Sequence, residues 1–269
     1  MLLRSFILLS FILVYGLAFS ILDHTVQNRN VQLQPALPAK FQQVASGYLR
    51  QIVSEILFIK TSVFLGGVKP GTPETTYAES LAHNFEVMTS LYPEFIDPYY
   101  FNQSFLAPIS LESARRANTI HQTGIEIFPN NFVLHFFYAF NYYRYLNEPL
   151  RAAKAFEDAA ALPDAPLMFG HLAALFSAEG GDITAGLVTL KTMLAAEQNE
   201  VVRERYQQEI EIFEKALTVE RAVSSYTKKY HIPPEKLEDL VPEHLEQLPE
   251  IQNNFILIYE PPLLRLERP

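Results

Sequence analysis

The sequence predicts an all-α protein in which helical hairpins stack into a solenoid, with an N-terminal transmembrane helix and a small C-terminal cap with a possible β-hairpin. Three observations lead to this prediction. Apolar residues recur at three- and four-residue steps from about Phe41 onward, which is the spacing of amphipathic helices. From Asp97 onward the chain can be aligned with itself at a period of about 34 residues. Near the N-terminus, residues 5–22 form an apolar run that contains no charged residue.

The composition excludes several classes of protein. The chain has 269 residues, of which 49% are hydrophobic, so it has enough apolar side chains for a sizeable core. It contains no cysteine, which excludes disulfide bonds, thiolate zinc sites, iron–sulfur clusters, a cysteine nucleophile and a lipid-modified cysteine. The net charge of -9 argues against a non-specific nucleic-acid binder, because such a protein needs a basic face. We therefore expect no nucleic acid among the partners.

Residues 1–22 are interpreted as a transmembrane anchor or a signal segment. As a helix, the uncharged run 5–22 would extend roughly 27 Å, just enough for a hydrocarbon core of ~30 Å. Arg4 before the run and Asp23 after it favour a cytoplasmic N-terminus and an extracytoplasmic, periplasmic body. We therefore expect a single-pass membrane protein that is attached through residues 5–22. The alternatives are a signal peptide cleaved at Ala18-Phe19-Ser20 and a buried helix of the fold.

Residues 23–40 are polar, contain two prolines and are interpreted as a linker. Helical repeats are expected over residues 41–199. The first helix covers residues 41–65, and the segment 66–73 (GGVKPGTP) clearly interrupts the helical pattern. A second amphipathic helix then ends at Pro93.

Three segments align at the period of the repeat, namely 98–131, 133–165 and 166–199. Each has a large apolar residue near the start of its first helix and a small residue where its two helices must touch. The large residues are Phe101, Phe136 and Phe169, and the small residues are Ala117, Ala152 and Ala185. This pattern resembles the tetratricopeptide repeat (TPR), a helix–turn–helix unit, over residues 41–199. The resemblance implies a scaffold, and a generic all-α bundle with chance periodicity is the alternative.

The C-terminal part is expected to close the array. Residues 200–230 form a long charged helix with apolar residues at core spacing, which suits the polar terminal cap that a stack of helix pairs needs. The tail, residues 231–269, begins with two short helical pieces broken by prolines. It continues with two short β-runs around Pro261-Pro262, which predict a possible β-hairpin. This tail is similar to the tails of some bacterial secretion- and pilus-associated envelope proteins.

No catalytic motif is recognisable in the chain. It lacks a GxSxG elbow, an HExxH helix, a Walker loop and a dinucleotide fingerprint. No two histidines lie three or four residues apart, so no helix face offers a pair of metal ligands. We therefore expect no cofactor, no metal and no enzymatic activity. An enzyme remains a third hypothesis, which a cluster of His135, His171, Asn141 and Arg144 around a deep pocket would favour.

The run 132–145 (FVLHFFYAFNYYRY) has aromatic side chains nearly all round a helix. The TPR resemblance implies that certain positions of each first helix line a concave groove, and these positions give the expected partner-binding residues Tyr99, Asn102, Leu134, Phe137, Asn141 and Arg144. The same positions also include Leu106, Ile109, Leu167, Gly170, Ala174 and Ser177. Aromatic surface, amides and one arginine suit an extended or helical peptide. The alternative is that the aromatic side chains pack between helices or under the N-terminal segment.

These features together predict a membrane-anchored TPR scaffold of a bacterial-type envelope. It would bind a protein or peptide partner in a pilus, secretion or folding pathway. The alternative is a permanent structural subunit of a membrane protein complex, in which neighbouring proteins cover the aromatic faces.

Overall fold

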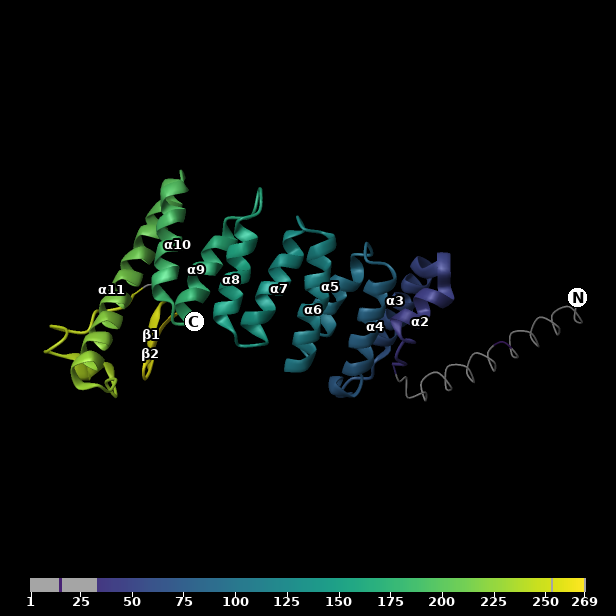
Figure 1. The fold of residues 1–269 in the computed structure, drawn as a ribbon, viewed down its shortest axis with the longest axis horizontal. Coiled ribbons are helices and arrows are strands. Elements are labelled where there is room, and N and C mark those ends of the chain that lie inside the picture. The colour runs from purple at the N-terminus through teal and green to yellow at the C-terminus, as the bar shows by residue number, and fades with distance from the viewer. Residues whose placement is uncertain (1–14, 16–32, 253, 269) are drawn as a thin grey trace, which may run out of the picture.

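The computed structural model describes residue 15 and residues 33–252 and 254–268. In this part of the chain, helices follow one another in sequence order along an elongated array (Figure 1). The helices are α2 (Ala39–Ser46), α3 (Arg50–Gly67), α4 (Ala78–Leu91), α5 (Asp97–Phe105), α6 (Leu111–Ile127), α7 (Phe132–Arg144), α8 (Pro149–Ala160), α9 (Met168–Glu179), α10 (Ile183–Ala196) and α11 (Glu200–Tyr230). The strands β1 (Ile256–Glu260) and β2 (Leu263–Glu267) form a two-stranded sheet that packs beside α9 and α11 near the C-terminal end of the array. The predicted all-α class and the C-terminal β-hairpin are confirmed.

The predicted membrane segment, residues 5–22, lies outside the described residues except for Tyr15. Among the helices that the structure does describe, none combines the length and the hydropathy of a membrane span.

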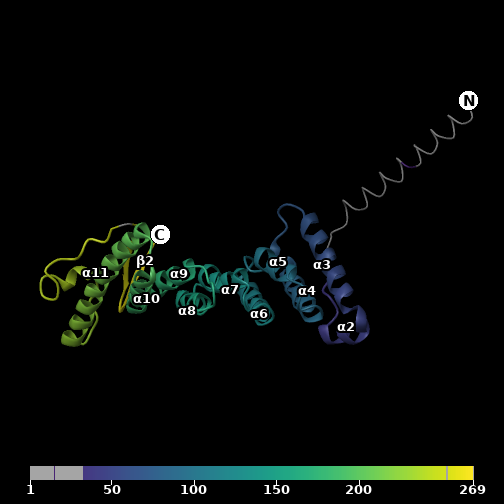
Figure 2. The same ribbon diagram turned by 90° about the horizontal axis from the view of Figure 1, so that it is seen from above.

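From α7 to α11 each helix packs mainly against the helices that precede and follow it in the sequence, whereas α4 also packs directly against α2 and α6. Figure 2 shows that α5, α7 and α9 lie along one side of the array, whereas α4, α6 and α8 lie along the other. The first aligned repeat has the shortest first helix. Helix α5 ends at Phe105, three residues before Pro108, and α6 begins after Ser110, whose hydroxyl accepts a hydrogen bond from the backbone N–H of Ser113.

Small residues at the helix contacts explain why the hairpins pack closely. Ala117 and Ala152 are fully buried, as the repeat alignment requires. The third repeat differs, because Ala185 is half-buried and its neighbour Gly186 makes the close contact. A Cβ atom at Gly186 would lie 2.6 Å from the carbonyl oxygen of Ala174 in α9. The alignment therefore predicted the contact correctly but placed it one residue too early.

Residues 34–36, within the predicted linker, pack against α4. The side-chain oxygen of Asn84 accepts a hydrogen bond from the backbone N–H of Ala36 (2.7 Å), and its amide nitrogen donates to the carbonyl of Gln34 (3.3 Å). The same amide nitrogen lies 3.4 Å from the hydroxyl of Thr61 in α3. Asn84 thus holds the extended segment, α3 and α4 together.

The tail closes the C-terminal end of the array. Strands β1 and β2 pair antiparallel, with Leu257 opposite Leu266. Phe255, Leu264 and Leu266 are buried in one core cluster with side chains of α9, α10 and α11. Of the two short helical pieces expected in this tail, the structure has one 3-10 turn, Leu237–Leu240, whereas the residues after it form a plain turn.

We expect Gly186→Ala to lower the free energy of unfolding by about 1–3 kcal/mol, because the backbone of α9 must move to admit the new methyl group. Gly66→Ala in α3 is the matched control, since a Cβ atom there meets no atom within 4 Å. This control should leave stability unchanged or raise it by up to about 1 kcal/mol. Urea unfolding followed by circular dichroism measures both changes. Equal stabilities of the two variants would contradict the close contact.

Candidate protein-binding surface

The structure separates the expected groove residues into two groups. Tyr99, Asn102, Leu134 and Asn141 are fully buried, so no partner reaches their side chains in this conformation. Phe137 is half-buried, and Arg144 is exposed at the last position of α7. The expectation that all six line an accessible groove is therefore corrected, and only Phe137 and Arg144 remain candidates for contact with a partner.

The remaining groove positions are also divided. Leu106 and Ala174 are fully buried. Ile109, Gly170 and Ser177 are half-buried, and Leu167 is exposed just before α9.

A buried polar cluster accounts for Asn102. Its amide nitrogen donates a hydrogen bond to the carbonyl oxygen of Ala117 (3.0 Å) and lies 3.3 Å from Nε2 of His121. The same ring nitrogen lies 3.1 Å from Oε1 of Gln103. Burial lowers the pKa of His121 to about 3, so the imidazole is neutral near neutral pH. This cluster joins α5 to α6 and has no surface from which to act on a substrate.

Tyr99 and Asn141, two further buried residues of the expected groove, differ in their hydrogen bonding. The hydroxyl of Tyr99 donates to the carbonyl oxygen of Pro93 (3.0 Å), and burial followed by the charge of Glu94 raises the pKa of Tyr99 to about 12. The side-chain amide of Asn141 forms no hydrogen bond with any described residue. Because Asn141 is fully buried, its side chain packs inside the array and offers no surface to a ligand.

Aromatic rings pack within α7 and between α7 and the first helices of the neighbouring hairpins, α5 and α9. The ring of Tyr100 in α5 meets that of Phe137 in α7 at 6.0 Å, and Phe136 stacks on Phe140 within α7 at 5.4 Å. Farther along, Tyr143 of α7 stacks on Phe176 of α9 with ring centroids 4.1 Å apart. Most of the aromatic run therefore holds hairpins together, which agrees with the alternative interpretation of its function.

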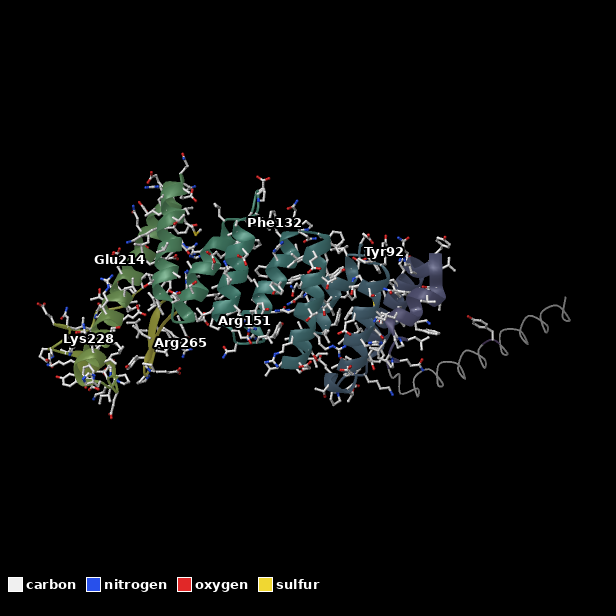
Figure 3. All side chains as sticks on the ribbon, in the orientation of Figure 1. Tyr92, Phe132, Arg151, Glu214, Lys228 and Arg265 are labelled. Atoms are coloured by element: carbon white, nitrogen blue, oxygen red, sulfur yellow. The ribbon has the colours of Figure 1, made fainter. Side chains whose placement is uncertain are left out.

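Apolar side chains at the end of α5 and the start of α7 remain exposed. Phe105 and Val133 are each about two-fifths exposed, at 40% and 44%. Arg144 forms no ion pair with any described residue. In the view of Figure 3, Phe132 and Tyr92 lie near one long edge of the array, and Arg151 and Arg265 lie near the other.

The histidines considered for catalysis have separate partners. Nε2 of His135 lies 2.8 Å from the carbonyl oxygen of Pro129 in the turn before α7. Nε2 of His171 lies 2.6 Å from a carboxylate oxygen of Glu209. In the part of the chain that the structure describes, no group of three or more histidine, aspartate or glutamate side chains is arranged to hold a metal ion.

Sequence reasoning missed Glu209, the most enclosed carboxylate of the array. Its second oxygen lies 3.2 Å from Arg205 and 3.2 Å from Arg268, so it links α9, α11 and the residue after β2. Burial by itself would raise the pKa of Glu209, but the hydrogen bond and charge of His171, together with Arg205, lower it. No sequence signal marks this residue, because two of its partners are 38 and 59 positions away.

Comparisons with protein-family models, with curated proteins and with solved structures found no match to this chain. The resemblance to the TPR therefore remains a prediction from the sequence pattern.

The pKa of His121 leads to a pH prediction. Since the imidazole titrates near its ordinary pKa of about 6.5 in the unfolded chain, only the unfolded state takes up a proton as the pH falls from there toward 3. We expect the free energy of unfolding to fall by about 1.4 kcal/mol per pH unit through this residue below pH ~6. His121→Gln should flatten this dependence, measured by urea unfolding at several pH values. His135→Gln is the control, and equal slopes for all three proteins would contradict the prediction.

Proposed function

We propose that this chain is a membrane-anchored scaffold of the TPR type that binds a protein partner during envelope assembly, in a pilus, secretion or folding pathway. Residues 5–22 would anchor it, with the body on the periplasmic side. The single observation that carries the proposal is the order of the array, in which helical hairpins follow one another and contact mainly their neighbours. Such arrays have an extended surface and few enclosed sites, which suits binding better than chemistry.

Phe137 and Arg144 give this proposal a testable surface. They lie seven residues apart on α7, so they share one face of the helix at a separation of about 10 Å. Arg144 is exposed and has no ion pair among the described residues, which leaves its guanidinium free for a carboxylate. A peptide with an apolar or aromatic side chain and an acidic group about two helical turns apart would match both.

The second candidate is a permanent structural subunit of a membrane protein complex. One observation favours it, because α2 and α3 have large apolar side chains exposed to solvent. A permanent subunit would have these side chains covered by neighbouring proteins. Purification of the detergent-solubilised chain discriminates the two candidates, since a stable and soluble isolated protein favours the scaffold and insolubility without partners favours the subunit.

We expect the double substitution Phe137→Ser with Arg144→Glu to reduce capture of the partner from native membranes by about tenfold or more. Partner identity and yield are measured by pull-down and mass spectrometry. Arg115→Glu on α6 is the matched control, because Arg115 is an exposed arginine on a different helix.

Phe137 also touches Tyr100 and His121, so the double variant is checked by circular dichroism. If helicity falls, Arg144→Glu alone serves as the test, because its side chain is exposed. Unchanged capture of the partner by a folded Arg144→Glu variant would contradict the proposed contact.

A further inference from the structure

Helix α3 is apolar on two opposite faces, and only one of them is covered. The inner face packs against the array through Ser54, Leu57, Phe58, Thr61 and Phe64. The opposite face has a row of aliphatic side chains that are 46% to 70% exposed, here called the outer seam. The outer seam comprises Leu49, in the 3-10 turn directly before α3, and Ile52, Ile56, Ile59 and Val63 of α3. A helix with apolar side chains on both faces is normally buried on both. The exposure of the outer seam shows that no described residue covers it.

The spacing of the outer seam indicates what covers it. Its members follow one another at steps of three, four, three and four residues, which is the a/d pattern of a coiled coil. This pattern makes a stripe narrower than the broad apolar face of a helix that lies on a lipid surface. At 1.5 Å per residue the row is about 21 Å long, or two heptads. A second helix with the same repeat fits this stripe.

Two charged residues flank the outer seam on opposite sides. With Ile56 at position a, Glu55 takes position g and Lys60 takes position e of the same helix. In a parallel coiled coil, a g residue faces the e residue five positions later on the neighbouring helix. Glu55 of one copy would therefore face Lys60 of another, and Lys60 would face Glu55 in return. Both side chains are exposed and neither forms an ion pair with a described residue.

We propose that the outer seam of α3 binds a second copy of this chain in parallel orientation. The charges favour this occupant over a lipid surface, because Glu55 and the net charge of -9 are unfavourable at an anionic membrane. A parallel dimer or trimer forms the same Glu55–Lys60 contacts. The proposal rests on the side chains of α3 and is independent of the partner proposed for α7.

Two features of the array leave the outer seam accessible and ready to pair. Residues 34–36 are bonded to Asn84, which also contacts Thr61 on the inner face, so this segment runs on the side of α3 away from the seam. Helix α3 is already ordered by its packing on α4, so association does not have to nucleate a helix. Because the row is short, we expect a weak contact, with a dissociation constant on the order of micromolar.

The absence of cysteine allows a direct test in the full chain, purified in detergent micelles. Val63→Cys and Leu49→Cys lie near opposite ends of the outer seam. Under mild oxidation, parallel pairing gives disulfide-linked dimers of each single variant, since identical positions face each other. Antiparallel pairing instead gives the link only when the two variants are mixed, and that result would overturn the parallel arrangement. Gln51→Cys, exposed on α3 outside the seam, is the matched control and should remain unlinked.

Charge exchange tests the pairing of Glu55 with Lys60. Glu55→Lys alone places like charges opposite each other and should weaken association on the order of tenfold in sedimentation. Adding Lys60→Glu restores opposite charges and should recover most of the loss, which a merely structural role of either residue would not produce. Failure of the double variant to recover would overturn the assignment of the seam.

The other possible occupants of the outer seam, another part of the same chain or lipid, give distinct results with the same cysteine variants. If the chain is monomeric in detergent and Val63→Cys resists alkylation there, another part of the same chain covers the seam. If the cysteine is alkylated in detergent and protected only in phosphatidylcholine–phosphatidylglycerol vesicles without any cross-link, lipid covers it. Either result would overturn self-association.

Discussion

The array depends on one constraint, which is that no helical hairpin of this chain buries its apolar surface alone. Each hairpin covers the one before it and needs cover from the one after it, so the two ends of the stack are the places where burial must be completed by other means. At the C-terminal end, the long helix α11 and the β1–β2 hairpin supply that cover, and Phe255, Leu264 and Leu266 are enclosed with α9, α10 and α11. At the N-terminal end, α3 has nothing on its outer face within the described residues. Among the described residues, the apolar surface is therefore covered at the C-terminal end of the array and exposed at the N-terminal end.

The same constraint explains where the small and aromatic residues lie. The two helices of the last hairpin, α9 and α10, approach closely because Gly186 has no side chain at the contact, and Ala117 and Ala152 are the small buried residues at the matching positions of the earlier hairpins. Where the helices stand farther apart, rings such as Tyr143 and Phe176 fill the space. Polar groups trapped in these contacts, such as Asn102 and His121, then bond to one another. The aromatic density of α7 is thus first of all a packing feature, and only its exposed end is free to bind.

The helical class and the C-terminal β-hairpin could be predicted, because apolar residues recur at helical spacing along most of the chain and two short β-runs flank Pro261-Pro262, whereas the accessible surface could not. Positions counted along an ideal repeat assume helices of standard length and rotation, but α5 is cut short before Pro108 and its Tyr99 and Asn102 point into the core. Glu209 was missed because its partners come from distant parts of the chain. For α3, the sequence contains both apolar faces, but which face the array covers depends on α4 and on Asn84, and only the folded chain reveals this.

The two proposals support each other physically if residues 5–22 hold the chain in a membrane. A contact as short as the outer seam is weak in solution, because few side chains must offset the loss of translational freedom. Anchoring two copies in one bilayer raises their effective concentration without adding any contact. Parallel pairing also leaves residue 33 of both copies at the same end of the pair, as two copies in one membrane require. A short seam next to an anchor can then hold two arrays together, each with the exposed end of its α7 left free for a partner.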